Sequence, residues 1–369
     1  MSTPREAAPS GFLAIGRDAV TVWKTGRSEE MSDSKSVSLF EHFRSLPDPR
    51  VERTKLHSLH DILVMTICAV ICGNDTWTDI EEFAVAREEW FQRFLKLPNG
   101  IPSHDTFGRV FAALDPVAFR ECFASWLATV SKELVGKVIA VDGKTLRRSF
   151  DTASEKKAIH MVSAWATGAR IVLGQVATDA KSNEITAIPE LLKTLELKGC
   201  IVTLDAMGCQ RKIAEEIVAR EGDYVIGLKG NQGTLRDDVK QFFDDQRACG
   251  FKDTVHAYAE DTDKDHGRIE TRRCWLVWDV AWLQARHGWP GLRSIVLLES
   301  ERTVGDKTTT EQRLYISSLA AADAPRMAQV IRQHWGIENG LHWCLDVAFN
   351  EDRCRVRVRH AAQNFATAT

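Results

Sequence analysis

The chain has 369 residues, of which 44% are hydrophobic and 27% charged, and a formal net charge of −3 at neutral pH. This length supports a large core and more than one domain, and the composition is that of an ordinary globular protein. Bulk charge alone therefore does not indicate a nucleic-acid partner, which would need basic residues gathered on one face. The longest apolar run, residues 62–72, is too short to span a bilayer, and the nine cysteines include no Cys-x-x-Cys pair. We expect no membrane span, no structural zinc and a reducing cytoplasm.

The N-terminal third of the chain indicates helices. Residues 1–36 lack periodicity, so we expect them to be disordered, or a mis-called extension before a true start at Met31. Residues 37–134 are predicted to form a small all-α domain. The expected helices and their signals are Ser58 capping 59–72, Thr78 with Glu81 as a capping box for 79–87, Ser103 starting a helix that ends before Asp115, and 117–134.

From Val138 onward, alternating and apolar runs indicate strands. The expected order is β-β-β-α-β-α-β, with a hairpin turn at 167–169. The predicted elements are strands 138–142, 158–166 and 170–178, helix 185–197, strand 200–204, helix 210–220 and strand 224–228. This order predicts an α/β fold with a mixed sheet covered by helices on both faces, as in the ribonuclease H-like fold.

Residues of about 229–320 are predicted to form a β-rich insertion within the domain 135–369. The insertion contains one expected helix, 234–243, and four strand-like runs, 253–260, 268–278, 293–300 and 312–318. A helix carrying Glu338 follows it.

Three acidic residues are candidates for one shared site. Asp142 and Asp205 lie at the ends of predicted strands, and Glu338 lies in a predicted helix one turn before His342. Two strand aspartates and a helical glutamate are the type of set that holds two divalent ions for phosphoryl transfer. The spacing alone does not prove this, because Asp142 before Gly143 also fits an ordinary turn cap.

Five runs together resemble the DDE transposases of bacterial insertion sequences, in particular the H-repeat-associated branch linked to Rhs elements. The runs are AVDGKTLRRS, TLDAMGCQ, YVIGLKGNQ, HGRIETRR and RQHWGIENGLHWCLDVAFNED, and the stretch from LFEHFRSLPDPR to PSHDTFGRVFAALDP resembles the helical domain of that branch.

The resemblance implies a ribonuclease H-like core that uses two Mg²⁺ or Mn²⁺ ions and cuts and joins DNA ends, with Asp142, Asp205 and Glu338 as both catalytic and metal-binding residues. Related transposases also carry a tyrosine, an arginine and a lysine around the glutamate. Here Ile331, His334 and Leu345 hold those positions, and His334 is expected to stand in for the arginine.

Basic residues near the three acids are candidate contacts to DNA phosphates. For each the alternative is a solvated surface position. The candidates are Lys144, Arg147 and Arg148 after the first aspartate, Lys229 at another strand end, Arg268 and Arg272 with a helper acid at Glu270, His334, and the alternating Arg353, Arg355, Arg357 and Arg359, which would share one face of a strand.

Several neighbours of the acids are expected to have other roles. We expect Asp346, Glu351 and Asp352 to be solvated or to cap helices. His342 and Trp343 are expected to be core residues or to support the metal ligands.

The sequence thus predicts a transposase that cleaves and joins insertion-sequence DNA. The alternatives are a nuclease that does not join strands, and a decayed, truncated copy that at most binds DNA, since related chains continue through another basic helix. The expected partner is double-stranded DNA, both element ends and target. We also expect a homodimer on DNA and a cytoplasmic, nucleoid-associated location.

Overall fold

The computed structural model describes residues 39–130, 137–150, 157–178, 183–265, 267–320 and 322–369. The segment 1–36, for which we expected disorder, lies outside these residues. The first described region is helical. Its elements are α2 (Leu39–His42), the 3-10 turn η1 (Glu52–Thr54), α3 (Leu59–Ile71), α4 (Trp77–Ala86), α5 (Glu88–Phe91), α6 (His104–Ala113) and α7 (Pro116–Val130).

Two helix starts in this region test the predicted caps. The Ser58 hydroxyl accepts a hydrogen bond from the Asp61 backbone N–H at 3.0 Å, which confirms that cap. The predicted capping box at Thr78 is wrong, because α4 begins earlier and Thr76 accepts from the Asp79 N–H. The reason lies in Trp77, whose ring packs 5.2 Å from each of two phenylalanine rings and so fixes the first turn of the helix.

The second region is built on a mixed sheet, as predicted. In the described residues it has nine strands in the order β3-β2-β1-β4-β5-β9-β8-β7-β6, with β1, β4 and β5 parallel and all other neighbours antiparallel. The strands are β1 (Val138–Thr145), β2 (His160–Ala166), β3 (Ile171–Ala177), β4 (Ile201–Leu204), β5 (Asp223–Leu228), β6 (His256–Asp265), β7 (Arg268–Val277), β8 (Ser294–Val304) and β9 (Lys307–Ser317).

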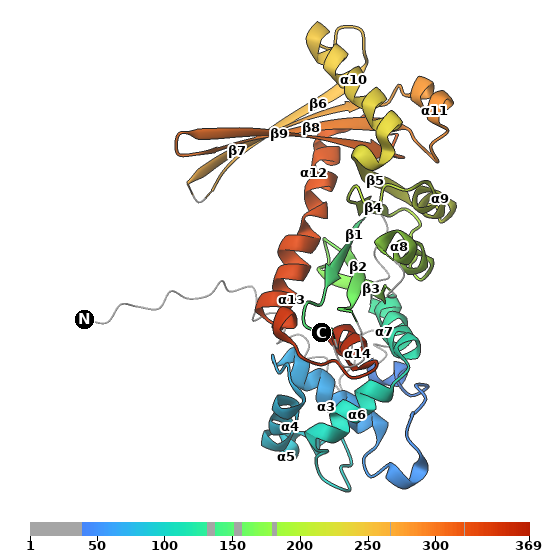
Figure 1. Ribbon diagram of the computed structural model, residues 1–369, viewed down its shortest axis with the longest axis vertical. Helices are drawn as coiled ribbons and strands as arrows, with labels where there is room; N and C mark the ends of the chain where they lie inside the picture. Colours follow the sequence, from blue (N-terminus) through green and yellow to red (C-terminus); the bar gives the residue numbers. More distant parts are fainter. Residues whose placement is uncertain (1–38, 131–136, 151–156, 179–182, 266, 321) are drawn as a thin grey trace, which may run out of the picture. The chain divides into compact units, whose positions relative to one another are not determined.

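Helices cover both faces of this sheet. One face packs against α8 (Glu184–Lys193), α9 (Arg211–Ala219), α10 (Gly233–Cys249) and α11 (Ala281–His287) around a continuous apolar core. The other face packs against α12 (Ala324–His334), the π turn η3 (Ile337–His342) and α13 (Trp343–Val347), as Figure 1 shows for α12 along the sheet. Helix α8 ends four residues before the predicted end, and α11 was not predicted.

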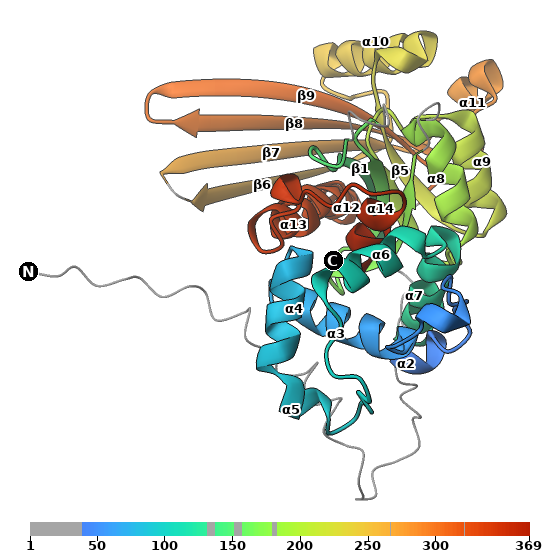
Figure 2. The ribbon, with the colours of Figure 1, turned by 60° about the horizontal axis from the view of Figure 1, so that its bottom comes forward.

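The β-rich stretch that follows β5 extends the same sheet. Its last strand, β9, pairs with β5 through Val225 and Ser317, so the four strands β6–β9 continue the sheet as a long antiparallel ribbon (Figure 2). We refer to β6–β9 as the arm. The arm strands are 10–11 residues long, whereas β4 has four residues.

The C-terminal segment returns to the helical region. The strand on which the alternating arginines would share one face is absent from described residues 351–360: a 3-10 turn η4 (Glu351–Arg353) leads through a segment without helix or strand into α14 (Ala361–Ala368). Helix α14 packs into the core of the helical region, where the Asn364 side-chain amide donates to the carbonyls of Phe111 and Leu114 at 2.8 and 3.0 Å. Among the helices that the structure describes, none has the length and apolar character needed to span a membrane.

Candidate active site

The two candidate aspartates stand where the pairing of two neighbouring parallel strands stops. Asp142 lies within β1, which continues to Thr145, and Asp205 directly follows β4. Val141 of β1 pairs with Leu204 of β4, and Asp142 and Asp205 are the residues that follow this pair. Adjacent strands lie about 4.8 Å apart, so the register brings the two carboxylates side by side.

Alternation along the strands decides which face these aspartates occupy. Val141 and Leu204 belong to the core beneath α8 and α9, so the residues that follow them point to the opposite face. That opposite face is the one covered by α12 and η3, because the Thr203 hydroxyl lies 3.1 Å from the His334 ring on α12. Both aspartates therefore lie on the side of the sheet where Glu338 is found.

Asp205 is fixed by its own backbone turn. One carboxylate oxygen, Oδ1, accepts hydrogen bonds from the N–H groups of Met207 and Gly208 at 2.8 and 3.2 Å. The Asn231 side-chain amide stabilises this backbone turn by donating a hydrogen bond to the Ala206 carbonyl at 2.6 Å. The second oxygen, Oδ2, takes no part in these bonds to the turn.

Asp142 lies in a more enclosed position. Burial raises the pKa of its carboxyl group to about 7, and the negative charges of Glu184, Asp205 and Glu338 act in the same direction, against a hydrogen bond from the Gly143 N–H. The negative charges that act on Asp142 come from carboxylates close to it, and neighbouring cations do not cancel their effect on its pKa. Asp142, Asp205 and Glu338 are thus coupled electrostatically.

Glu338 is presented by a π turn, where we expected a regular α-helix. The turn runs from Ile337 to His342 between α12 and α13, and it is anchored by Ile337 and Leu341, which pack with Ala140 of β1 and Trp165 of β2. A π turn adds one residue to the helical register, so His342 does not sit directly one turn below Glu338 as predicted. Glu338 itself is exposed.

Two histidines flank Glu338 and reach the two strands that carry the aspartates. His334 contacts Thr203 of β4, and His342 Nδ1 lies 3.8 Å from the Asp142 carboxylate. Burial lowers the pKa of each ring to about 4, so both are neutral at pH 7. A neutral His334 cannot supply the positive charge of the arginine whose place we expected it to take.

The remaining residues around the glutamate differ from the predictions. Trp343, which we expected in the core, has 53% of its surface exposed, so that expectation is wrong. Ile331 and Leu345, at the positions of the tyrosine and lysine in related transposases, are buried core residues with 2% and 4% exposure.

A cavity of about 300 Å³ opens beside the acids. Its lining includes Asp205, Glu338, His334 and the predicted DNA contact Lys229, which is exposed. Further basic side chains lie around it: Arg236, Lys240 and Arg313, the last of which stacks 4.5 Å over the Trp335 ring. The lining also includes Asp244 and Glu311, which form ion pairs with Lys240 and Arg313, so part of this positive charge is balanced.

The donor set fits a hard divalent cation in chemistry and in charge. Asp142, Asp205 and Glu338 offer carboxylate oxygens, which Mg²⁺ and Mn²⁺ prefer. Burial is the main cause of the raised pKa of Asp142, and the negative charges of Asp205 and Glu338 add to it, so a bound cation would stabilise the ionised carboxylate. In the part of the chain that the structure describes, no three His, Cys, Asp or Glu side chains already stand in the geometry of a closed metal site.

A further carboxylate, Glu184, was missed by the sequence reasoning. It begins α8 and bonds His160 at 2.6 Å, and His160 in turn lies 2.8 Å from the Thr145 hydroxyl. The His160–Glu184 pair packs closely against the Gly143 backbone, where an added Cβ would lie 2.2 Å from His160 and 2.3 Å from Glu184. The glycine after Asp142 could have indicated a close neighbour, because a glycine in a strand often permits another group to approach the backbone closely.

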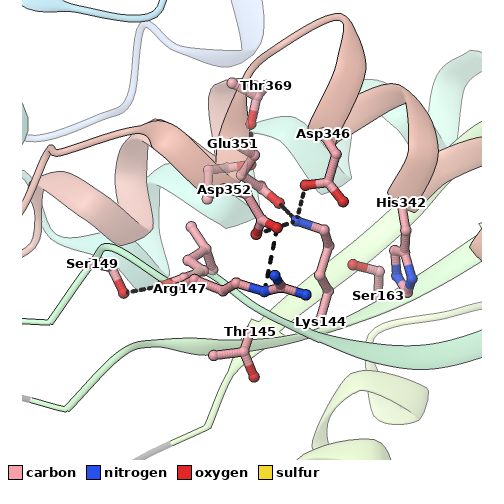
Figure 3. Close-up of polar contacts among 12 residues, drawn as sticks. Lys144, Thr145, Arg147, Ser149, Ser163, His342, Asp346, Glu351, Asp352 and Thr369 are labelled. Carbon is pink, nitrogen blue, oxygen red and sulfur yellow. Dashed lines mark hydrogen bonds and ion pairs between the residues drawn. The ribbon is translucent and has the colours of Figure 1, made fainter.

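The basic residues that follow Asp142 have different surroundings. Lys144 contacts Asp346, Glu351 and Asp352, while Arg147 is mostly exposed and lies 3.3 Å from Asp352 (Figure 3). The expectation that these three acids are solvated or cap helices is therefore wrong. A contact of Lys144 with DNA stays a prediction, although its ammonium is already surrounded by carboxylates.

The C-terminal arginines divide into two kinds. Arg353 and Arg355 are exposed, whereas Arg357 donates to the Arg148 carbonyl at 2.8 Å and stacks 4.8 Å over the Phe150 ring. This contact places the exposed Arg148 and the C-terminal segment next to each other. Within this segment Val356 packs into the helical core, whereas Val358, the next apolar position, is exposed, so the alternation is not kept.

In the arm, Arg272 and its neighbours form ion pairs. Arg272 lies 2.6 Å from Glu270, the predicted helper acid, and 3.7 Å from Asp261. Arg268 is half-buried at the start of β7 and pairs in register with Val304. Their predicted contact with DNA and that of Arg359, which is exposed at a positive φ of 48°, stay predictions.

Comparisons with known proteins cover most of the chain from residue 40 onward. A family described as "Transposase DDE domain" matches residues 133–369, and one described as "DDE_Tnp_1-associated" matches residues 40–127. The H repeat-associated putative transposase YhhI of Escherichia coli K12 is 42% identical over 334 residues, covering 89% of this chain and 87% of the relative. An uncharacterized protein in the dhlA 3′ region of Xanthobacter autotrophicus is 44% identical over 76% of this chain and 94% of its own length. The putative transposase YncI of Escherichia coli O157:H7 is 42% identical, covering 88% and 84%.

Proposed function

This chain belongs to the DDE transposase family, and we propose that it cleaves insertion-sequence DNA ends and joins them to a target by metal-dependent phosphoryl transfer. The observation that carries the proposal is the register of β1 and β4, which sets Asp142 and Asp205 side by side on the face occupied by the Glu338 helix. The mixed order of β1–β5 supports a ribonuclease H-like core.

In this proposal Asp142, Asp205 and Glu338 hold two Mg²⁺ or Mn²⁺ ions. Bound ions of this kind supply an activated water and stabilise the leaving oxygen of a phosphodiester. Asp205 is pre-oriented by the two backbone N–H groups that fix one of its oxygens. His334 and His342 remain neutral and hold the Glu338 turn against β4 and β1, so they position the glutamate and do not transfer protons at neutral pH.

The protein's basic groups give the DNA a path to these acids. Lys229, Arg236 and Arg313 line the cavity next to Asp205 and Glu338 and would contact the backbone of the strand being cut. Arg147, Arg148, Arg353 and Arg355 are exposed near the loop that follows Asp142 and would hold the flanking duplex. We further propose a homodimer on the DNA.

We keep the proposed domain division of residues 37–134, helical, and 135–369, catalytic, with the insertion at about 229–320. The packing of α14 against α6 adds one refinement: the last helix of the catalytic region completes the core of the helical one. We therefore expect the two regions to fold as one unit.

The test is an assay that separates cleavage from joining. The purified protein is incubated with Mg²⁺ or Mn²⁺, a labelled duplex that carries the element end flanking the reading frame, and a plasmid target. We expect a cleaved end and a joined product. Cleavage without joining would favour a nuclease, and the absence of cleavage with either ion, together with intact DNA binding, would favour a decayed copy.

A further inference from the structure

Lys144 stands at the centre of a buried ion cluster beside the acids. It is two residues after Asp142 on β1, and its side chain is only 12% exposed. Its Nζ lies 2.6 Å from Glu351 Oε2, 2.7 Å from Asp346 Oδ1 and 3.5 Å from Asp352 Oδ1 (Figure 3). The three carboxylates surround the ammonium from one side of the strand.

All three partners come from the segment that follows Glu338. Asp346 lies on α13, which continues the π turn without a break, and Glu351 and Asp352 form the turn η4. Between α13 and η4 the chain reverses direction at Asn350, which has a left-handed φ of 49°. Glu351, the next residue, is therefore buried, with 7% of its surface exposed. One side chain of the Asp142 strand is thus bonded to both ends of the segment attached to the Glu338 turn.

The cluster leaves Lys144 with little capacity for another ligand. An ammonium group has three protons, and here three carboxylates lie within ion-pair distance of it. A buried carboxylate such as Glu351 would be costly without its cation, so the partners are held together strongly. Carboxylates that surround Lys144 would also repel a DNA phosphate, which argues against the direct contact predicted from the sequence.

We propose that Lys144 is a positioning residue that locks the end of β1 to the α13–η4 segment and thereby sets the spacing between Asp142 and Glu338. This inference rests on the proposed function, because the spacing matters through the ions that the acids hold. Residues that orient metal ligands typically change metal affinity or activity by about 10- to 100-fold when they are replaced.

The experiment measures metal binding and DNA binding separately from cleavage. Mn²⁺ affinity is determined by calorimetry for the full chain and for Lys144→Met, Lys144→Arg and the double variant Lys144→Met/Glu351→Gln. The double variant removes both buried charges, so it keeps the test valid if Lys144→Met alone unfolds. Lys193→Met, which removes a half-exposed lysine that pairs with Glu190 on the surface, is the matched control. Thermal unfolding verifies that each variant is folded.

We expect the Lys144→Met forms to bind Mn²⁺ at least about tenfold more weakly. Lys144→Arg should restore most of the affinity, because it keeps the charge among the carboxylates. DNA affinity without divalent ions, and its dependence on salt, should stay as in the parent and in Lys193→Met.

Two results would overturn the inference. Unchanged or tighter Mn²⁺ binding in the folded variants would show that the cluster does not set the ligand spacing. A loss of DNA affinity with a salt slope reduced by about 0.9, at unchanged Mn²⁺ affinity, would make Lys144 a phosphate contact. A parent that binds Mn²⁺ but cuts no DNA would reject the proposed function while leaving the Mn²⁺ comparison of the variants decisive for Lys144.

Discussion

The centre of the sheet and its arm are continuous in hydrogen bonding but differ in almost every other respect. The central strands β1, β4 and β5 are parallel and covered on both faces, and all four residues of β4 are buried. The arm strands are long, and β9 has six exposed residues before its buried end. Parallel strands that end together create an edge where carboxylates can meet, whereas a long antiparallel ribbon gives reach and a charged surface.

The arm is also held differently. Arg332 of α12 lies 3.1 Å from Asp263 and 3.5 Å from Asp261 of β6, and all of these side chains are substantially exposed. Such exposed pairs contribute less than about 1 kcal/mol each. We therefore expect replacement of a carboxylate at the centre of the sheet to change DNA cleavage strongly, and replacement of a charged residue on the arm to change it little.

The largest expected difference is between two Asp→Asn changes. Asp205→Asn at the centre should reduce DNA cleavage by at least about a thousandfold without unfolding the protein, because it removes a charge needed to hold the ions. Asp263→Asn on the arm should leave cleavage within about threefold of the parent. The measurement is single-turnover cleavage of an end duplex in Mg²⁺. Equal losses in both variants would mean that the centre and the arm share the catalytic role.

A second prediction concerns stability against pH in a metal-free buffer. The pKa of Asp142 is raised to about 7 in the folded protein from an ordinary value of 3.8, so the folded state is favoured below pH 3.8 and that advantage is lost as the pH rises through 7. Asp142→Asn should therefore be more stable than the parent at pH 8, by up to about 4 kcal/mol.

A carboxylate on the arm is expected to have the opposite effect on stability against pH. The pKa of Asp263 is lowered by its bond to Arg332, so the stabilising effect of this carboxylate is present at pH 8 and is lost in acid. Asp263→Asn should thus be slightly less stable than the parent at pH 8. Chemical unfolding at pH 5 and pH 8 measures both, and a destabilised Asp142→Asn at pH 8 would contradict the electrostatic picture of the centre.

Glycine-to-alanine substitutions should destabilise the two regions for different reasons, by a steric clash at the centre and by backbone strain on the arm. Gly143→Ala at the centre places a methyl group against the His160–Glu184 pair and should destabilise the protein by about 1–3 kcal/mol while weakening cleavage. Gly305→Ala in the β8–β9 turn meets no neighbour within 4 Å, so only its positive φ of 57° is strained, at about 1 kcal/mol and with cleavage unchanged. Gly230→Ala, with neither problem, is the control.

The smallest expected effects are on the salt dependence of DNA binding. Arg353→Gln and Arg355→Gln should each lower the slope of log K against log salt by about 0.9, because each exposed phosphate contact releases that fraction of a counterion. Arg272→Gln on the arm should change the slope little, since Glu270 and Asp261 already balance its charge. A larger change for Arg272 would make the arm the main DNA surface.

The sequence predicted the centre better than the arm for a physical reason. Short buried strands such as 201–204 appear as apolar runs. Asp205 directly follows this strand, and Asp142 follows the buried apolar start of β1. The arm strands continue through charged and threonine-rich residues, so β9 begins at Lys307, five residues before the predicted strand. In an antiparallel ribbon the partner strand supplies the hydrogen bonds, and composition alone does not reveal it.

The candidate site was predictable only in part. The two aspartates and Lys229 could be chosen from the ends of predicted strands, and Glu338 from a predicted helix. The π turn could not be predicted, because one extra residue in a helix leaves the pattern of apolar positions nearly unchanged. Lys144 is instructive in the same way. A lysine beside an acidic site suggests a phosphate contact, while the three carboxylates that surround it come from residues more than 200 positions later.

The position of α14 has a consequence for synthesis of the chain. Asn364 and Phe365 fill the core between α4, α6 and α7, and the Asn364 amide bonds residues that lie 253 and 250 positions earlier in the chain. Until Asn364 and Phe365 are synthesised, the carbonyls of Phe111 and Leu114 lack these hydrogen bonds and part of the Trp77 ring is uncovered. Contacts so distant in sequence form late, because closing a long loop is entropically costly. The earliest helices to be made are thus the last to be completed, and a ribosome stalled before codon 364 would hold an aggregation-prone intermediate.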